Sequence, residues 1–204
     1  HSVDIGRVSV SASAPKGTGG LWLIDPTDAT INQTVANSYA TTLNGGTSVL
    51  NEVTGAITWS SNVTLTKNAG GDATLTLKAT DNITLGTGSS IKSTSNKLNI
   101  SLISDSDSNK VGGIYVTGDL DSNGGDILMG GGADGSAAAG YITNVPGANT
   151  LAVRTESGTA NSINARGGNI TIKGTGDINA ASQLASGWGV DINSALTTTG
   201  ARSI

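Results

Sequence analysis

The chain has 204 residues, including 30 Gly and 3 Pro but no Cys or Phe, and only 3% of its residues are aromatic and 13% are charged. The formal net charge of -4 and the lack of any basic run argue against a nucleic-acid groove or an anionic membrane surface as the partner. The lack of Cys excludes disulfides and thiol chemistry, and no apolar stretch approaches the roughly 18–20 residues of a membrane span, so we expect neither an anchor nor a signal peptide.

Short alternating segments predict β-strands along the chain, because aliphatic residues alternate with Thr, Asn or Lys and so give one dry and one wet face. The predicted strands are 62–66, 73–78, 82–85, 97–103 and 169–173. Clusters of Asn, Asp, Ser and Gly separate them and predict tight turns. We expect no helix.

Two gapless overlays indicate an internal repeat. Residues 114–124 match 190–200, and 119–127 match 162–170 with a shared Gly-Gly-Asp/Asn-Ile corner. The offsets are 76 (114 to 190) and 43 (119 to 162). If one coil takes roughly 20 residues, these offsets are close to whole numbers of coils, and about nine coils would form a rod roughly 45 Å long.

Two all-β architectures compete: an antiparallel sandwich or barrel, and a parallel β-solenoid. A sandwich fills its gap of about 10 Å with aromatic side chains, which are scarce here, whereas a narrow coil is filled by Val, Ile, Leu and Ala. We therefore predict a single β-solenoid segment of a longer repeat protein over 1–204, with loop excursions near 32–56 and 129–162. Asn and Thr at equivalent corners are expected to form ladders between coils.

Three motifs in order carry a family resemblance: a WLIDP turn at 22–26, TLTLKA at 74–79 and GGNITI at 167–172. In this order they resemble the filamentous-haemagglutinin-type exoproteins over nearly the whole chain. These proteins are β-helical adhesins that Gram-negative bacteria export by two-partner secretion or related autotransport. The resemblance implies a right-handed parallel β-helix, and because the family's secretion domain is not matched, it implies a repeat segment from the shaft.

Two acidic stretches have the alternating oxygen ligands of a calcium loop. They are Asp119, Asp121 and Asn123 in the first stretch and Asp105, Asp107 and Asn109 in the second. Neither has the acidic residue expected twelve positions from the start, where Gly130 and Val116 stand instead. Solvated turns are the alternative to calcium, and no other cofactor is expected.

The residues give little support to catalysis. Polysaccharide-acting β-helices use clustered acids, and two carboxylates could in principle cleave a glycosidic bond. Here the acids lie mostly in predicted turns, and the only histidine is His1, which leaves no evident proton shuttle. We therefore expect no enzymatic activity.

The few aromatic residues have two interpretations. They are Trp22, Trp59, Trp188, Tyr39, Tyr115 and Tyr141. If exposed, their rings would stack on apolar sugar faces. Alternatively, they cap the ends of the solenoid or bridge insertions.

These observations and the resemblance together predict a shaft segment of a large secreted adhesin on the outer-membrane exterior, which mediates attachment, aggregation or biofilm formation. The expected partner is a host or neighbouring cell surface, an extracellular polysaccharide or the chain itself, with no membrane insertion and no nucleic acid. The first alternative is a self-assembling filament, matrix or sheath protein, which raw strand edges would favour. A polysaccharide-acting enzyme is the second.

Overall fold

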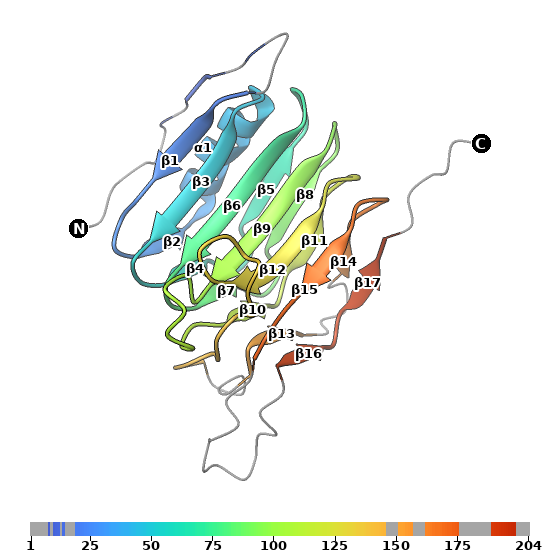
Figure 1. The fold of residues 1–204 in the computed structure, drawn as a ribbon. Coiled ribbons are helices and arrows are strands. Elements are labelled where there is room, and N and C mark those ends of the chain that lie inside the picture. Colours follow the sequence, from blue (N-terminus) through green and yellow to red (C-terminus); the bar gives the residue numbers. More distant parts are fainter. Residues whose placement is uncertain are drawn as a thin grey trace, which may run out of the picture.

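The computed structural model describes residues 8, 10–12, 14, 19–145, 151–156, 162–175 and 189–198, which are mostly β and form three all-parallel sheets (Figure 1). Sheet A contains, in spatial order, β1 (Leu21–Ile24), β3 (Ser48–Val53), β6 (Ala73–Ala79), β9 (Leu98–Ser104), β12 (Ile127–Gly131) and β15 (Ile170–Ile172). Sheet B contains β2 (Ala29–Ile31), β4 (Ile57–Trp59), β7 (Ile83–Leu85), β10 (Ile114–Val116), β13 (Val153–Thr155) and β16 (Val190–Ile192). Sheet C contains β5 (Thr64–Lys67), β8 (Ser90–Ser93), β11 (Asp119–Asp121), β14 (Ser162–Asn164) and β17 (Ala195–Thr197).

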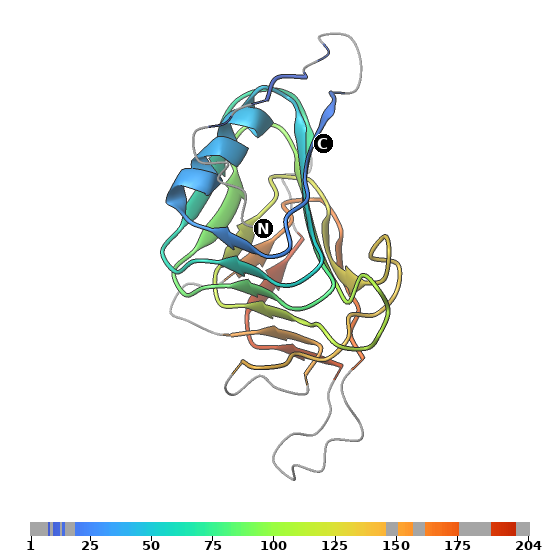
Figure 2. The ribbon, with the colours of Figure 1, turned by 90° about the vertical axis from the view of Figure 1, so that its left-hand side faces the viewer.

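The chain visits sheets A, B and C in turn, and we call each such passage a coil. Every strand pairs in parallel with the equivalent strand of the neighbouring coil, as Ile57 with Ile83 in sheet B and Leu75 with Ile100 in sheet A. Figure 2 views this stack from its N-terminal side. The parallel pairing is compatible with the predicted β-solenoid and differs from the antiparallel sandwich that competed with it.

The overlays predicted the register correctly but not the coil length. Ile114 pairs with Val153, which pairs with Val190, so the offset of 76 spans two coils. Asp119 and Ser162, 43 residues apart, lie in adjacent coils. A coil without insertions takes 26 residues, as from Thr64 to Ser90. Sheets A and B have six strands each, so the expectation of about nine 20-residue coils is wrong.

The interior is filled by stacked aliphatic columns. Ile57, Ile83, Ile114 and Val153 occupy one register position in four successive coils, and each is fully buried. Complete burial of such a side chain contributes roughly 1.5–3 kcal/mol. Because the interior is narrow, branched aliphatic residues fill it without the aromatic side chains that a sandwich needs.

One helix, α1 (Gln33–Asn44), takes the place of the sheet C strand in the first coil. Asn32 caps it by accepting a hydrogen bond from the Val35 amide at 3.0 Å. Its buried face includes Tyr39 and Leu43, and the helix packs against β5, the first strand of sheet C. The expectation of no helix is therefore wrong, and 32–56, where loops were expected, contains α1 and β3. Among the described residues no helix is long and apolar enough to cross a membrane.

Polar ladders join the coils where sheet C leads into sheet A. The Asn99 side-chain oxygen accepts the Asp126 amide at 2.9 Å, and the Asp126 carboxylate accepts the Asn169 amide at 2.8 Å. The chain turns just before each ladder residue through left-handed conformations, as at Asn123 (φ 50°) and Gly124 (φ 92°). The predicted ladders are confirmed, with Asp126 as an additional member.

The same corner has an inward-facing lysine. Lys67 is fully buried, and its ammonium donates to the carbonyl oxygens of Ala69 (3.0 Å) and Ser95 (2.6 Å). Desolvation lowers the pKa of Lys67. In the next coil Ser93, the register partner of Lys67, donates to the Asn96 carbonyl at 2.9 Å, so inward polar side chains satisfy corner carbonyls in successive coils.

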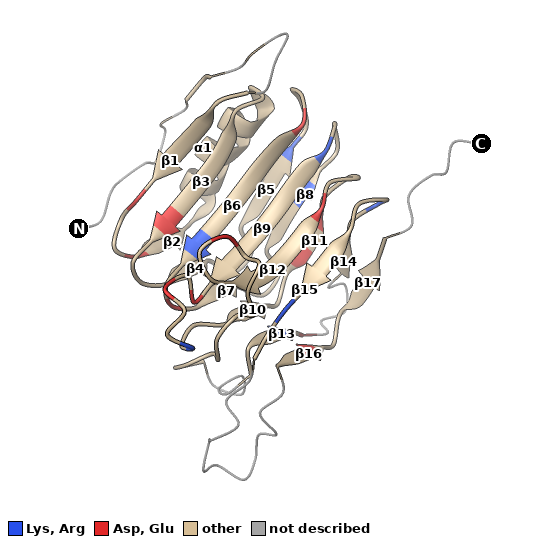
Figure 3. Ribbon diagram, viewed as in Figure 1, with Lys and Arg blue, Asp and Glu red and all other residues tan. Residues whose placement is uncertain are grey.

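Charged residues are sparse and are scattered along the strands and corners rather than gathered into a field of one sign (Figure 3). Lys78 and Glu52 form an ion pair at 2.8 Å between β6 and β3. Exposed pairs of this kind contribute about 0–1 kcal/mol. The stack is therefore held mainly by strand pairing and its aliphatic interior.

Candidate binding groove

The connections from sheet A to sheet B, which we call the A–B corner, are longer in the last three coils than in the first three. In the first three coils they are 25–28, 54–56 and 80–82, and in the last three they are 105–113, 132–152 and 173–189. The connections from sheet C to sheet A stay short, as 68–72 and 165–169 show. Insertions in stacked repeats project from one face, often the binding face, so the A–B corner of the later coils is the candidate functional surface.

The insertion of the fifth coil is packed against sheet A. Ala137 pairs antiparallel with Gly131, and Gly135 (φ +79°) lies over the outer face of the sheet. A Cβ at Gly135 would stand 2.7 Å from Leu128 Cδ2 and 3.2 Å from Ile103 Cγ1. Only glycine permits this approach, so this part of the expected excursion near 129–162 is fixed. The same range also contains the end of β12 and all of β13.

The chain then rejoins the stack at residues 141 and 142. Tyr141 pairs with Val111 of the fourth coil. The Ile142 amide then donates to Leu151 at 2.6 Å, and these two apolar side chains form a small cluster against which Tyr115 packs. Burial, followed by a hydrogen bond with Glu156, raises the pKa of Tyr115 to about 12. The cluster thus covers the outer face of β10.

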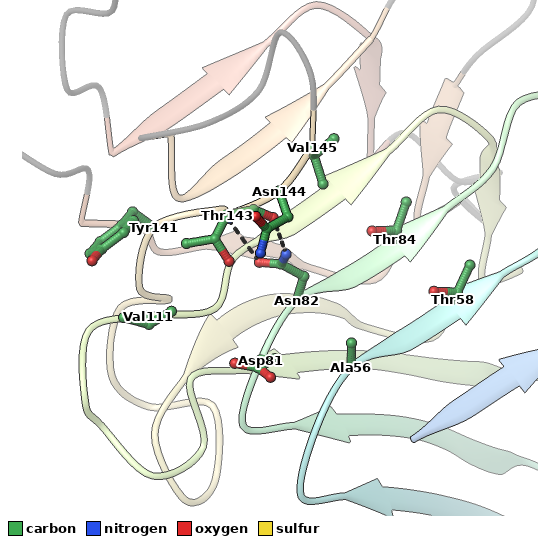
Figure 4. Close-up of a pocket in the computed structure, with 10 residues that line it drawn as sticks. All are labelled: Ala56, Thr58, Asp81, Asn82, Thr84, Val111, Tyr141, Thr143, Asn144 and Val145. Atoms are coloured by element: carbon green, nitrogen blue, oxygen red, sulfur yellow. Dashed lines mark hydrogen bonds between the residues drawn. The ribbon is translucent and has the colours of Figure 1, made fainter. Parts of the chain in front are cut away.

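Asn82 holds residues 141–145, which we call the wall, against the stack. Its Nδ2 donates to the Thr143 carbonyl at 2.6 Å, and its Oδ1 accepts the amides of Thr143 (3.3 Å) and Gly113 (3.1 Å) (Figure 4). The side-chain amide therefore substitutes for a backbone strand partner. It connects two segments 61 residues apart in the sequence.

A groove with a volume of about 670 Å³ lies between the wall and the outer face of sheet B. Its floor includes Thr58 and Thr84, which are register partners on β4 and β7 and stand side by side in Figure 4. Asp81 and Asn82 line it from the A–B corner, and the wall contributes Tyr141, Thr143 and Asn144. The lining is mostly polar, and its described residues include no Lys, Arg or His.

Most of these polar groups are available to a ligand. The side chains of Thr58, Asp81, Thr84, Tyr141, Thr143 and Asn144 make no hydrogen bond or ion pair with any other described residue. Asn82 is the exception, since it is committed to the wall. The groove therefore offers unused hydroxyl, amide and carboxylate groups above a rigid sheet.

A second hollow, of about 430 Å³, lies on the outer face of sheet A. Its lining includes Asn99, Asp126 and Asn169, which are already hydrogen-bonded to each other as the ladder. It has fewer uncommitted groups than the groove beside sheet B and is the weaker candidate.

The first predicted calcium stretch lies on the outer face of sheet C and its following corner, and each of its three side chains has a protein partner. Asp119 accepts the Ser162 amide at 2.7 Å. Both Asp121 carboxylate oxygens lie 2.8 Å from Arg166 Nε in an ion pair. Asn123 Nδ2 donates to the Asn96 carbonyl at 3.1 Å. These side chains thus connect neighbouring coils.

The second stretch forms part of the A–B corner. Asp105 is buried and accepts the Lys110 amide at 3.0 Å, and desolvation raises its pKa. Asp107 accepts from Asn109 Nδ2 at 2.8 Å, and Asn109 Oδ1 accepts the Val111 amide at 2.7 Å. The described residues contain no group of three or more His, Cys, Asp or Glu placed to hold a metal. Calcium binding at these stretches stays a prediction.

The aromatic residues divide between the interior and the groove. Trp22 and Tyr39 meet edge to face with ring centroids 5.9 Å apart, and Trp59 is fully buried. Tyr115 lies under the apolar cluster, which leaves Tyr141 as the aromatic residue lining the groove. Trp188 lies outside the described residues.

Sequence reasoning did not identify Asp81, Asn82 or Asn144 as parts of one surface. The available signal was the uneven spacing of the repeats, which marks where insertions gather but not what they contact. Comparisons with protein-family models, curated proteins and solved structures found no match to this chain.

Proposed function

We propose that this chain is a shaft segment of a secreted bacterial surface adhesin of the filamentous-haemagglutinin type and that its coils form a right-handed parallel β-helix. The observation that carries the proposal is the combination of a regular parallel stack with insertions gathered at one corner. Such a design separates a rigid support from a surface that can vary and bind.

The stack suits a load-bearing role. Each of coils two to six is joined to the coil before it in sheets A and B, and from the third coil onward in sheet C as well. The β6–β9 pair alone aligns six residues of each strand. Separating two coils therefore requires many hydrogen bonds to break together, which favours a mechanical function.

The proposed function is non-enzymatic. Glycoside hydrolysis uses two carboxyl groups on either side of the scissile bond, and the described residues of the groove lining supply one, that of Asp81. Asp119 and Asp121 belong to an acidic stretch outside the groove, and replacing both by Asn should leave glycan turnover unchanged. Turnover that depends on these acids would favour the enzyme instead.

The adhesin proposal is tested on producing cells. Antibodies against the segment should label intact cells, and deletion of its coding region should reduce attachment or aggregation. Labelling that appears only after permeabilisation, or attachment that is unchanged by the deletion, would contradict it. The expected location is the exterior of the outer membrane.

A specific observation favours self-assembly as a second candidate. Val190 and Leu196 are 38% and 44% exposed, although their register partners Val153 and Ile163 are fully buried. The interior columns are thus exposed at the sixth coil, where either a further coil or a second copy would continue them. Light scattering over a concentration series, with electron microscopy of the same sample, should show filament growth. Persistent monomers would refute this candidate.

A further inference from the structure

We infer that the groove beside sheet B binds a neutral oligosaccharide, one end of which rests against the wall at 141–145. The inference rests on the proposed function, since it assigns a ligand class to the adhesin's candidate surface. The groove volume of about 670 Å³ falls within the roughly 300–1,000 Å³ of small-ligand sites.

The lining selects for hydroxyl-rich ligands. Thr58 and Thr84 supply hydroxyls that both donate and accept, Asn144 an amide, and Asp81 a carboxylate that accepts. Adjacent sugar hydroxyls present the complementary donors and acceptors. Tyr141 adds an aromatic ring, whose face suits the apolar side of a sugar ring.

The charge of the lining argues for a neutral sugar. An anionic glycan would need Lys or Arg for its carboxylate or sulfate groups, and the described residues of the groove lining include neither. The Asp81 carboxylate would repel such a ligand. A purely apolar ligand would leave the polar groups of the lining unpaired, which is costly.

The shape of sheet B gives the groove a closed end. Thr30, Thr58 and Thr84 occupy one register position on β2, β4 and β7, about 4.8 Å apart. The next position is Tyr115, which is covered by Ile142 and Leu151. An extended sugar chain can therefore lie along the threonines, and its end meets the wall.

Binding is measured with a panel of neutral tetrasaccharides, namely cellotetraose, laminaritetraose, chitotetraose and mannotetraose, with a heparin tetrasaccharide as the anionic comparison. Ligand-observed NMR and calorimetry report the affinity. We expect at least one neutral member to bind and heparin not to bind. Failure of every neutral member at millimolar concentration, or preference for heparin, would overturn the inference.

Variants then locate the site. Asp81→Ala and Asn144→Gly should each weaken binding about fivefold, the loss expected for one hydrogen bond. Glycine is used at Asn144 because its φ is 57°. Thr84→Val should weaken binding, whereas the matched control Thr66→Val, on the outer face of β5 in sheet C, should not. Binding that survives the Asp81→Ala and Asn144→Gly double variant, with its melting temperature unchanged, would refute the site.

The two proposals fail separately. A surface-exposed protein that supports attachment but binds none of the neutral sugars leaves the adhesin proposal standing and removes the groove inference. A protein that binds a sugar through the groove but is not exposed on cells keeps the site and removes the adhesin assignment.

Discussion

Replacement of Asn82 by Ala should detach the wall from the stack. The side chain makes three hydrogen bonds, of 2.6, 3.1 and 3.3 Å, to Thr143 and Gly113. A typical hydrogen bond contributes about 0.5–1.5 kcal/mol net. Because the longest bond is weak and water can replace some of the others, we expect the free energy of unfolding to fall by about 2 kcal/mol.

Urea unfolding measures that loss, and hydrogen exchange shows where it occurs. In Asn82→Ala the amides of Thr143 and Gly113 should exchange faster than in the parent, because both lose their acceptor. Amides within β6 should follow only the global change in stability. Asn82→Asp should lose the bond to the Thr143 carbonyl, since a carboxylate cannot donate, but it should keep more protection of the two amides than Asn82→Ala, since a carboxylate still accepts them.

Asn68→Ala is the matched control, because Asn68 is exposed and its side chain makes no hydrogen bond to another described residue. Its effect should stay within about 0.5 kcal/mol. If Asn82→Ala costs no more than this control, or if Thr143 keeps its protection, then Asn82 does not hold the wall.

Three further changes test the packing and the buried charges. Gly135→Ala should lower the free energy of unfolding by about 1–3 kcal/mol in urea, because the added Cβ would crowd Leu128 and the φ of this residue is positive. Gly71→Ala is the control, since no atom lies within 4 Å of its added Cβ, and equal losses in the two variants would contradict the packing. Lys67→Met should lower the free energy of unfolding by about 1–3 kcal/mol, because the carbonyls of Ala69 and Ser95 lose their donor. Lys78→Met, on the outer face of β6, should lower it less, and the reverse order would refute the role of Lys67. Asp105→Asn should stabilise the fold at pH 7, because burial raises the pKa of Asp105 and its ionisation opposes folding as the pH rises above the unfolded-state pKa. The gain should shrink near pH 4, and a gain that grows on acidification would contradict this sign.

The strands and their register were predictable because they depend on patterns between residues close together in the sequence. Alternation of aliphatic and polar residues located the strands, and the recurring Gly-Gly-Asp/Asn-Ile corner aligned Ile127 with Ile170 in the register that the structure has. The coil length was misjudged because both overlays involve the later coils, where insertions lengthen the repeat. Only the earlier, weakly similar coils show the 26-residue period.

The helix and the groove were harder to predict for different reasons. The signal for α1 is an Asn32 cap followed by a short apolar face in a Thr- and Asn-rich segment, which resembles the surrounding strands and turns. The groove depends on contacts such as Asn82 with Thr143, across 61 residues. No local pattern encodes such a contact, because its partners come together only after three coils have stacked.

The division between repeated and unrepeated structure explains why the groove is the better candidate for recognition. The outer face of sheet B places Thr30, Thr58 and Thr84 at one register position in three successive coils, so a ligand on them would find nearly equivalent sites. The wall makes these positions different from one another. Apolar residues of the insertion cover Tyr115, whereas Thr84 in the preceding coil stays accessible in the groove next to the wall. A single defined site therefore arises where an insertion meets the repeat, and the stack below holds its floor in place.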